Sequence, residues 1–459
     1  MSYLLNLTRH NEIGANCYYL EHQNTGVVLD AGMHPKLDGH SALPDLEVID
    51  RKPVKAIFVS HAHHDHTGAL PLLMERHPDV PVFLSEPTYF LADPLLHNSV
   101  NVMKRQRLEA GVQDYPLYTH RDIHQAVGRW QACHFDEEWS LEGYPLAKHL
   151  NEKQTFKLHH AGHILGSAAI ELNLNGLKTL YTGDINFRDQ TLMTAARLPE
   201  EQVHLLIIET TRGAQPTADG YSRQHAEEEL LKAIQNTFER DGAVLMPIFA
   251  MGKTQELLSF LYRAQRRGEI PDHPIHIGGL GKVFSQVYDR LARSSPRALQ
   301  DLSIFEDIRP QVFDWKQMNK FKPLPGHLYL LPSGMMTRQT TSNRLARHFL
   351  NDERHSIFFV GYTDPDSPAG QLRATGKDEK VLLNQDDGPQ RIGCEIRHFD
   401  FTSHATREDI LDFILRTKPL QCALVHGDPD ALEWFQKAVQ DLAPEINVFI
   451  PEPKKEVPL

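Results

Sequence analysis

The sequence predicts an α/β protein in which a strand-rich first part is interrupted by a doubly wound α/β domain. The chain has 459 residues, a length that suits two or three packed units. Residues 1–211 read as short strands joined by loops and a few helices, whereas residues 212–390 alternate helix and strand regularly. Such alternation is typical of a parallel sheet with helices on both faces.

The first 211 residues contain short apolar runs that predict strands. The run KAIFVS at 55–60 is largely apolar, as expected of a strand buried on both faces. Other strands are expected within 18–30 and at 80–84, 168–174, 177–183 and 203–209. Helices are expected at 68–76, within 87–108 and near 120–130.

The rest of the chain predicts the inserted domain and a return to the first domain. Within 212–390 we expect helices at 222–240, 253–267, 282–294 and 341–350, and strands at 243–249, 274–278, 327–331 and 356–362. Residues 391–459 are expected to rejoin the first domain, with helices at 406–416 and 429–440 and strands at 421–426 and 446–450. The final segment, PEPKKEVPL, predicts a loose tail.

Composition excludes several classes of protein. Hydrophobic residues make up 41% of the chain and charged residues 24%, which excludes long disordered and coiled-coil proteins. No stretch approaches the roughly 18–20 consecutive apolar residues that span a bilayer. The start lacks a basic region followed by an apolar core, so we expect no secretory signal. The four cysteines lie far apart, which argues against a disulfide framework and for a reducing, cytoplasmic location.

The charge balance bears on a nucleic-acid partner. Lys and Arg number 48 against 60 Asp and Glu, for a net charge of −12. An acidic protein is a poor binder of phosphate unless its basic residues are clustered. The acidic excess lies in the segments on either side of 212–390, and that segment is close to neutral. The charge therefore weakens a nucleic-acid interpretation without excluding it.

Histidines beside aspartates predict a metal centre. His61 and His63 follow the strand at 55–60, and alternate residues of an extended segment face the same way, so both can bind one metal. A turn would then bring Asp65 and His66 to a second metal. Imidazole and carboxylate suit Zn²⁺ and similar divalent ions, with Mn²⁺ an alternative. Further ligands come from later loops: His163 in HHAGHILGSA, and Asp184, which could bridge both ions.

These motifs resemble those of the metallo-β-lactamase superfamily, in which HxHxDH, a later His and a later Asp form a binuclear site. The surrounding segments LDAG at Asp30, DHTGALP, GHILGSA and TGDI are similar too. This resemblance covers roughly residues 1–210 and implies an αββα metallo-β-lactamase sandwich.

Later motifs resemble the β-CASP nuclease subfamily, in the group that contains RNA 3′-end-processing endonucleases. They are IIETT at 207–211, PIFAMGKTQELL at 247–258, PSGMM at 332–336, FDFTSH at 399–404 and LVHGD at 424–428. The resemblance then covers nearly the whole chain, with 212–390 as the inserted doubly wound α/β β-CASP domain and 391–459 as the return to the metallo-β-lactamase domain.

The resemblance implies two Zn²⁺ per chain and assigns roles to single residues. One ion would be held by His61, His63 and His163, and the other by Asp65, His66 and His426, with Asp184 bridging. Asp65, His404 and Glu209 are the expected catalytic residues: His404 would protonate the departing sugar oxygen, and Glu209 would hold the imidazole and favour its charged form. Asp30 is expected to support the ligands from outside.

Three further residues are expected to contact substrate: Lys253, Ser333 and Arg338. Lys253 stands where relatives usually carry Arg, which keeps a cation but loses bidentate phosphate geometry. The segment PSGMMTRQTT also lacks the paired glycines expected after SGM. Both departures lie in the expected substrate region, so they concern the substrate and not the metal chemistry.

The leading hypothesis is a zinc-dependent RNA endonuclease, with exonuclease action and a homodimer left open. A hydrolase of a small ester, thioester or lactam would share the metal site but leaves the insertion, Glu209 and His404 without a purpose. A DNA-processing β-CASP nuclease is a third alternative, and its branch generally lacks the histidine found here at 426. A catalytically inactive scaffold subunit would lose metal ligands, and here every ligand position is filled.

Overall fold

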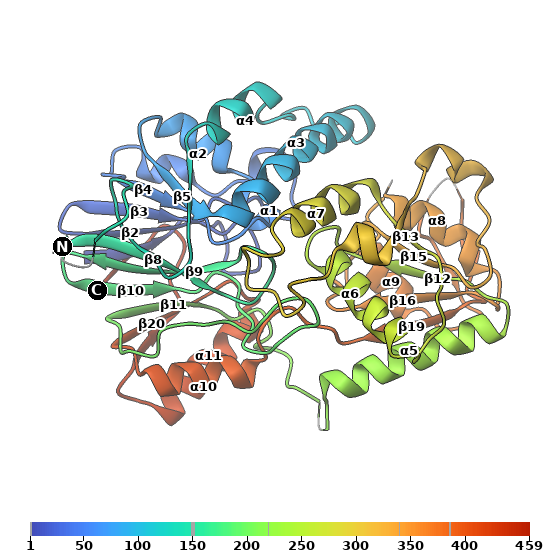
Figure 1. Ribbon diagram of the computed structural model, residues 1–459. Coiled ribbons are helices and arrows are strands. Elements are labelled where there is room, and N and C mark those ends of the chain that lie inside the picture. The colour runs from blue at the N-terminus through green and yellow to red at the C-terminus, as the bar shows by residue number, and fades with distance from the viewer. Residues whose placement is uncertain (1, 148–151, 219, 339, 385–386) are drawn as a thin grey trace. The chain divides into compact units, whose positions relative to one another are not determined.

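The computed structural model describes residues 2–147, 152–218, 220–338, 340–384 and 387–459 (Figure 1). The chain folds into two compact units. The first unit comprises Met1–Asp189, Thr194–Thr217 and His404–Leu459, and the second comprises Gln190–Met193 and Ala218–Ser403. Among the described residues, no helix combines the length and apolar character needed to cross a membrane.

The first unit contains two seven-stranded sheets. In order across the first sheet these are β22 (Glu456–Pro458), β1 (Ser2–Asn6), β2 (Tyr18–His22), β3 (Thr25–Leu29), β4 (Ala56–Phe58), β5 (Val82–Ser85) and β6 (Trp130–Cys133). Across the second they are β21 (Asn447–Phe449), β20 (Gln421–Val425), β11 (Leu205–Glu209), β10 (Leu177–Tyr181), β9 (Ala168–Leu174), β8 (Gln154–His160) and β7 (Glu138–Ser140).

A shared apolar core joins the faces of these two sheets. Phe58 of β4 and Phe83 of β5 meet Phe156 of β8, with ring centroids 4.9 and 4.6 Å apart. Such aromatic burial stabilises a sandwich through apolar area removed from water. The site residues described below follow the ends of strands in both sheets.

Helices cover the outer faces of the sandwich (Figure 1). On one side lie α2 (Leu70–Arg76), α3 (Glu86–Glu109) and α4 (His120–Val127). On the other, α10 (Arg407–Thr417) and α11 (Pro429–Leu442) bury Phe413 and Phe435 against the second sheet. Ser85 and Thr119 cap α3 and α4 by accepting from backbone N–H groups, which fixes where these helices begin. The first unit is therefore an αββα sandwich, as predicted.

The second unit is built on a six-stranded parallel sheet. In order its strands are β14 (Gln311–Val312), β13 (Ile275–Ile277), β15 (Leu328–Leu331), β12 (Val244–Pro247), β16 (Ser356–Val360) and β19 (Glu395–Phe399). Every residue of β12, β15 and β16 is buried, so both faces are covered. The helices are α5 (Arg223–Glu239), α6 (Lys253–Arg266), α7 (Gly279–Arg290), α8 (Thr341–Leu350) and α9 (Pro368–Ala374). A small pair, β17 (Lys380–Val381) and β18 (Gln390–Arg391), lies apart from this sheet.

Three of the differences from the sequence expectations concern where the units begin and end. The prediction of a loose tail is wrong, because β22 pairs antiparallel with β1 and Lys454 forms an ion pair with Asp45. The compact second unit extends to Ser403, beyond the expected end at 390, because β19 pairs with β16. It also includes 190–193, where the Glu256 carboxylate accepts from the backbone N–H groups of Thr191 and Leu192.

Candidate active site

The histidine-rich segment follows β4 and runs into the short helix α1 (His64–Thr67). Backbone hydrogen bonds hold α1 on the segment after β3: the N–H groups of Ala31 and Met33 donate to the carbonyls of His66 and His64. A Cβ at Gly32 would stand only 1.7 Å from the Asp65 carbonyl oxygen, so only glycine permits this approach. The segment is thereby fixed with His61 and His66 fully buried.

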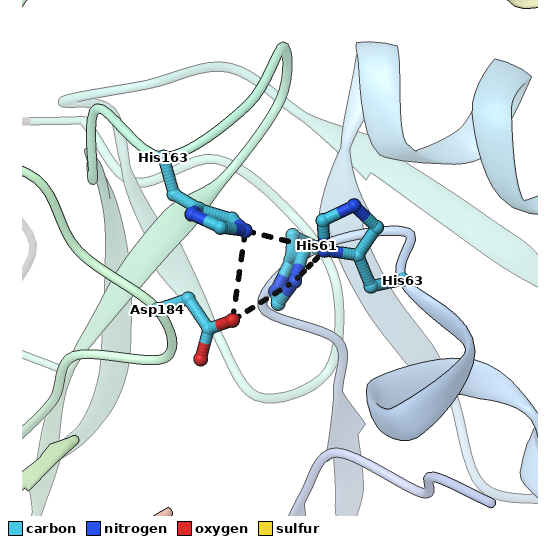
Figure 2. Close-up of side chains that lie close together, drawn as sticks. All are labelled: His61, His63, His163 and Asp184. Atoms are coloured by element: carbon cyan, nitrogen blue, oxygen red, sulfur yellow. Dashed lines mark hydrogen bonds and ion pairs between the residues drawn. The ribbon is translucent and has the colours of Figure 1, made fainter. Parts of the chain in front are cut away.

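Four side chains form the first predicted metal group (Figure 2). The Nδ1 atom of His63 lies 3.0 Å from Nε2 of His61 and 3.2 Å from Nε2 of His163. The Asp184 Oδ2 atom lies 3.5 Å from Nε2 of His61 and 3.6 Å from Nε2 of His163. Three ring nitrogens and one carboxylate oxygen thus converge on one point, the donor set and number that a tetrahedral zinc ion takes.

A second group lies beside the first and shares Asp184. The His426 ring has Nε2 3.4 Å from Asp65 Oδ2 and Nδ1 3.1 Å from Asp184 Oδ1. Nε2 of His66 lies 3.4 Å from the same Asp184 oxygen and 3.8 Å from Asp65 Oδ2. Asp65, His66 and His426 offer atoms close enough to hold one ion.

Asp184 connects the two groups. Its Oδ2 faces the first group and its Oδ1 faces the second, so one carboxylate reaches both. The Oδ1 atom is buried, and although ring nitrogens of His426 and His66 lie near it, none has the alignment of a hydrogen bond, which costs free energy unless a cation neutralises the oxygen. The residues present therefore fit two divalent ions, and the geometry brings together all seven predicted ligands.

Burial sets the protonation of the rings in the first group. It lowers the pKa of His61 and of His63, and neighbouring histidines lower both further. Both imidazoles are thus held neutral, the form that binds a metal. Burial alone would raise the pKa of Asp184, but the surrounding His426, His66 and His61 outweigh it and hold that pKa well below its usual value.

Asp30 is a buried carboxylate that accepts hydrogen bonds from His66 and from two neighbouring residues. Its Oδ2 accepts from His66 Nδ1 at 2.7 Å, from the Tyr181 hydroxyl at 2.6 Å and from the Ser60 hydroxyl at 2.7 Å. Its Oδ1 accepts from the Ser60 backbone N–H at 2.7 Å. Because Nδ1 of His66 donates to Asp30, its Nε2 is left as the acceptor facing Asp184. The carboxylate thus fixes the tautomer and orientation of a candidate ligand.

His404 and Glu209 form a pair at the rim of the metal groups. Nδ1 of His404 lies 3.1 Å from both oxygens of the Glu209 carboxylate, which is only 1% exposed. Nε2 of His404 lies 4.0 Å from Asp184 Oδ2. Burial lowers the pKa of His404, but the Glu209 charge and hydrogen bond outweigh it, so the pKa is raised. The imidazolium is thus stabilised with its second nitrogen directed at the metal groups.

The three predicted substrate residues lie in the second unit, after the carboxyl ends of β12 and β15. Lys253 is 9% exposed and donates from Nζ to the Phe401 carbonyl and, at 3.0 Å, to the Ser403 hydroxyl. Ser333 is half-buried and Arg338 is exposed. Lys253 therefore holds the chain just before His404, and a phosphate contact for any of the three stays a prediction.

Sequence reasoning missed several residues that organise the site. Ser60 and Tyr181 hold Asp30, Asn16 places its amide 3.1 Å from Nε2 of His66, and the Thr211 hydroxyl lies 3.0 Å from Nδ1 of His426. Ser60, Tyr181 and Asn16 are single residues of common types with no motif spacing, and Thr211 lies in the IIETT segment, where its type alone suggests no role. One signal was available: Tyr181 is a polar-tipped side chain at the buried end of a predicted strand, where a buried hydroxyl needs a partner.

Three family models match the chain in succession. The metallo-β-lactamase superfamily model matches residues 10–129, the β-CASP domain model 254–372, and a model described as the Zn-dependent metallo-hydrolase RNA specificity domain 389–451.

Several curated proteins are similar over most of the chain. An endoribonuclease of Candida glabrata, YSH1, is 26% identical over 94% of this chain and 55% of its own length. The cleavage and polyadenylation specificity factor 73 of Drosophila melanogaster is 25% identical over 96% of this chain and 62% of its own. The transcription termination factor FttA of Methanocaldococcus jannaschii is 28% identical over 94% and 68%. The chain spans about half the length of the first of these relatives.

A solved structure has the same fold. The crystal structure of a protein of unknown function from Enterococcus faecalis V583 superposes with a TM-score of 0.57, covering both chains fully at 13% identity. An αββα sandwich with converging histidines, an inserted parallel α/β domain and three successive family matches lead to one assignment. The chain belongs to the β-CASP branch of the metallo-β-lactamase superfamily.

Proposed function

We propose that the protein is a metal-dependent RNA phosphodiester hydrolase that acts as an endonuclease. The observation that carries the proposal is the His404–Glu209 pair beside the two metal groups, because a positioned imidazolium is what the departure of a sugar oxygen requires. The names of the endoribonuclease and RNA-cleavage relatives and the RNA specificity model support the substrate class.

The metal content is part of the proposal. His61, His63 and His163 would hold one ion, Asp65, His66 and His426 the other, and Asp184 both. We propose Zn²⁺ at both positions, supported by the imidazole-rich donor set. When bound, such ions supply Lewis-acid stabilisation of charge on a phosphodiester and activation of water.

The protein's own residues then divide the remaining work. Water adds to phosphorus, the bond from phosphorus to the leaving sugar oxygen breaks, and His404 gives that oxygen a proton from Nε2. Glu209 accepts from Nδ1 of His404 throughout, which fixes the ring and stabilises its charged form. Asp65, besides serving as a ligand, carries a carboxylate that is 21% exposed beside the second group and can accept a proton from the attacking water.

Other hydrolases explain less of the molecule. A small ester, thioester or lactam gives no role to the His404–Glu209 pair or to the six-stranded second unit. A DNA-processing nuclease stays the alternative, which the substrate test below decides. Exonuclease action, a homodimer and a cytoplasmic location stay predictions.

The decisive experiment supplies the metal-loaded protein with end-labelled single-stranded RNA, DNA of the same sequence and a panel of small esters and lactams. We expect internal cleavage of RNA, with much slower turnover of the other substrates. Elemental analysis of the same preparation should give close to two metal equivalents per chain. Ester or lactam hydrolysis with intact RNA would overturn the proposal.

A further inference from the structure

Two exposed aromatic rings lie at the carboxyl edge of the parallel sheet in the second unit. Four aromatic side chains are exposed in the described chain: Tyr144, Phe249, Trp315 and Tyr362. Phe249 is 43% and Tyr362 47% exposed. Each is the second residue after its strand, β12 or β16, and these strands are parallel neighbours in the sheet. Both rings therefore follow adjacent strands at one edge of the sheet.

The backbone beneath Phe249 is well supported. Its carbonyl accepts from the Thr254 backbone N–H at 3.2 Å and from the Thr254 hydroxyl at 2.7 Å, at the start of α6. In the loop after the neighbouring strand β15, a Cβ at Gly334 would stand 3.3 Å from the Phe249 ring, so the ring packs against glycine backbone. Phe249 is thus a fixed ring with one side packed and a large area exposed.

Tyr362 is supported through the glycine that precedes it. Gly361 has φ +95°, its N–H donates to the Phe399 carbonyl at 2.9 Å, and its carbonyl accepts from Nε2 of His398 at 2.8 Å. A Cβ at Gly361 would stand 3.2 Å from the Phe401 carbonyl oxygen. These contacts hold the start of the loop that presents Tyr362.

The side chains at this edge of the sheet are better suited to contact nucleotide bases than phosphate groups. Ligands of parallel α/β sheets bind outside the carboxyl ends of the strands. Of the two predicted phosphate-binding cations at this edge, Arg338 is exposed, whereas Lys253 is already engaged with the Phe401 carbonyl and the Ser403 hydroxyl, and Asp364 and Asp366 follow Tyr362. A groove for the phosphate backbone would instead be rich in exposed cations. Exposed rings on a rigid edge are what single-stranded nucleic acids use for base stacking.

From the same edge the chain continues to the candidate general acid. It leaves β19 at Phe399 and reaches His404 five residues later, with Lys253 bonded to two residues of that segment. We propose that Phe249 and Tyr362 form a base-stacking subsite for unpaired nucleotides of the RNA substrate. The inference rests on the proposed RNA hydrolase function and names how that substrate is recognised.

The test measures binding of a short, fluorescein-labelled, phosphorothioate-linked single-stranded RNA to the metal-loaded protein. Phe249→Leu and Tyr362→Leu should each weaken the Kd roughly 5- to 100-fold, the usual contribution of one stacked base. Phe249→Tyr and Tyr362→Phe keep a ring and should bind like wild type. Tyr144→Leu removes an equally exposed ring, 46%, from the first unit and should have no effect.

Two further readouts separate stacking from other roles. The slope of log Kd against log salt should be unchanged in the leucine variants, since stacking releases no counterions. An RNA of the same length without bases should bind weakly to wild type and lose nothing more in the variants.

Leucine variants that bind like wild type, or that lose as much affinity for the baseless RNA, would overturn the inference. A changed oligomeric state of these variants in light scattering would also overturn it, because the rings would then serve a protein interface. Failure of the proposed function is distinct: wild type would leave RNA uncut, whether or not the rings bind it.

Discussion

His404 lies beside the candidate metal ligands but is held by Glu209 through Nδ1. His404→Ala should therefore cut RNA cleavage roughly 10²–10⁴-fold, the usual effect of losing a general acid, while both metals stay bound. Cleavage rate and metal content are measured on one preparation, with His124→Ala, a change of an exposed histidine on α4, as control. Full activity in His404→Ala with metals retained would refute its role.

Glu209 acts through His404, and this predicts how the two substitutions combine. Glu209→Gln removes the charge that favours the imidazolium but keeps a hydrogen-bond acceptor, so its rate should fall between wild type and His404→Ala. Because the residues work as a unit, the double variant should be little slower than His404→Ala alone. Rate losses that simply multiply would show that Glu209 acts independently.

His426 should behave differently from His404. Its ring lies within 3.4 Å of Asp65 and 3.1 Å of Asp184 but not in the first metal group. His426→Ala should lower the metal content from about two equivalents toward one, as shown by elemental analysis after dialysis. Retention of both equivalents would remove His426 from the proposed ligand set.

Asp30 contacts one candidate metal ligand directly, His66, and reaches His61 through the Ser60 hydroxyl. Asp30→Asn weakens the acceptor that fixes Nδ1 of His66, so affinity for the second ion should fall roughly 10- to 100-fold. Competition with a chromogenic chelator measures this affinity. Asp45→Asn is the matched control, because Asp45 is also a buried carboxylate of the first unit but pairs with Arg9 and Lys454. An equal loss in both variants would indicate general destabilisation.

Helices and strands could be predicted from the sequence where the local pattern of apolar residues matches the burial of those residues in the structure. The strands β9 and β11 are mostly apolar in sequence, and both could be predicted because most or all of their residues are buried. The metal ligands were predicted for a similar reason: His61, His63 and His66 are close together in the sequence. Features that depend on residues far away in the sequence could not be predicted from the local pattern. Examples are β22, which pairs with β1, and the 190–193 segment, which Glu256 holds.

The pairing of β22 with β1 gives a prediction for this element. Leu4 pairs with Val457, and the Leu459 N–H donates to the Ser2 carbonyl, so removing residues 453–459 would leave β1 as an open edge. Amide hydrogen exchange in 2–6 should then become faster, as measured by mass spectrometry. Exchange in α5, which belongs to the second unit, is the internal control. Unchanged protection of 2–6 would contradict the pairing.

Across the whole molecule, we expect the two units to differ in their dependence on metal. All seven candidate ligands belong to the first unit, where they follow β4, β8, β10 and β20 and so connect its two sheets. Bound ions should therefore stabilise the first unit as any ligand of the native state does, by about 2.7 kcal/mol for one ion at 100 times its Kd. The second unit contributes no predicted ligand and should be unaffected.

Thermal unfolding should show this asymmetry. Removing one such ion with a chelator should lower the transition of the first unit by roughly 5–10 °C, at about 2–4 °C per kcal/mol for a unit of this size, and removing both should lower it by about twice as much. Tryptophan fluorescence reports mainly on the first unit, which holds Trp130, Trp139 and Trp434, and Trp315→Phe removes the contribution of the second. Hydrogen exchange in β12 and β16 follows the second unit in the same samples. An equal shift of the thermal transitions of both units on chelation would show that the ions also stabilise the second unit. The proposed ligand set, which comes from the first unit alone, would then be incomplete.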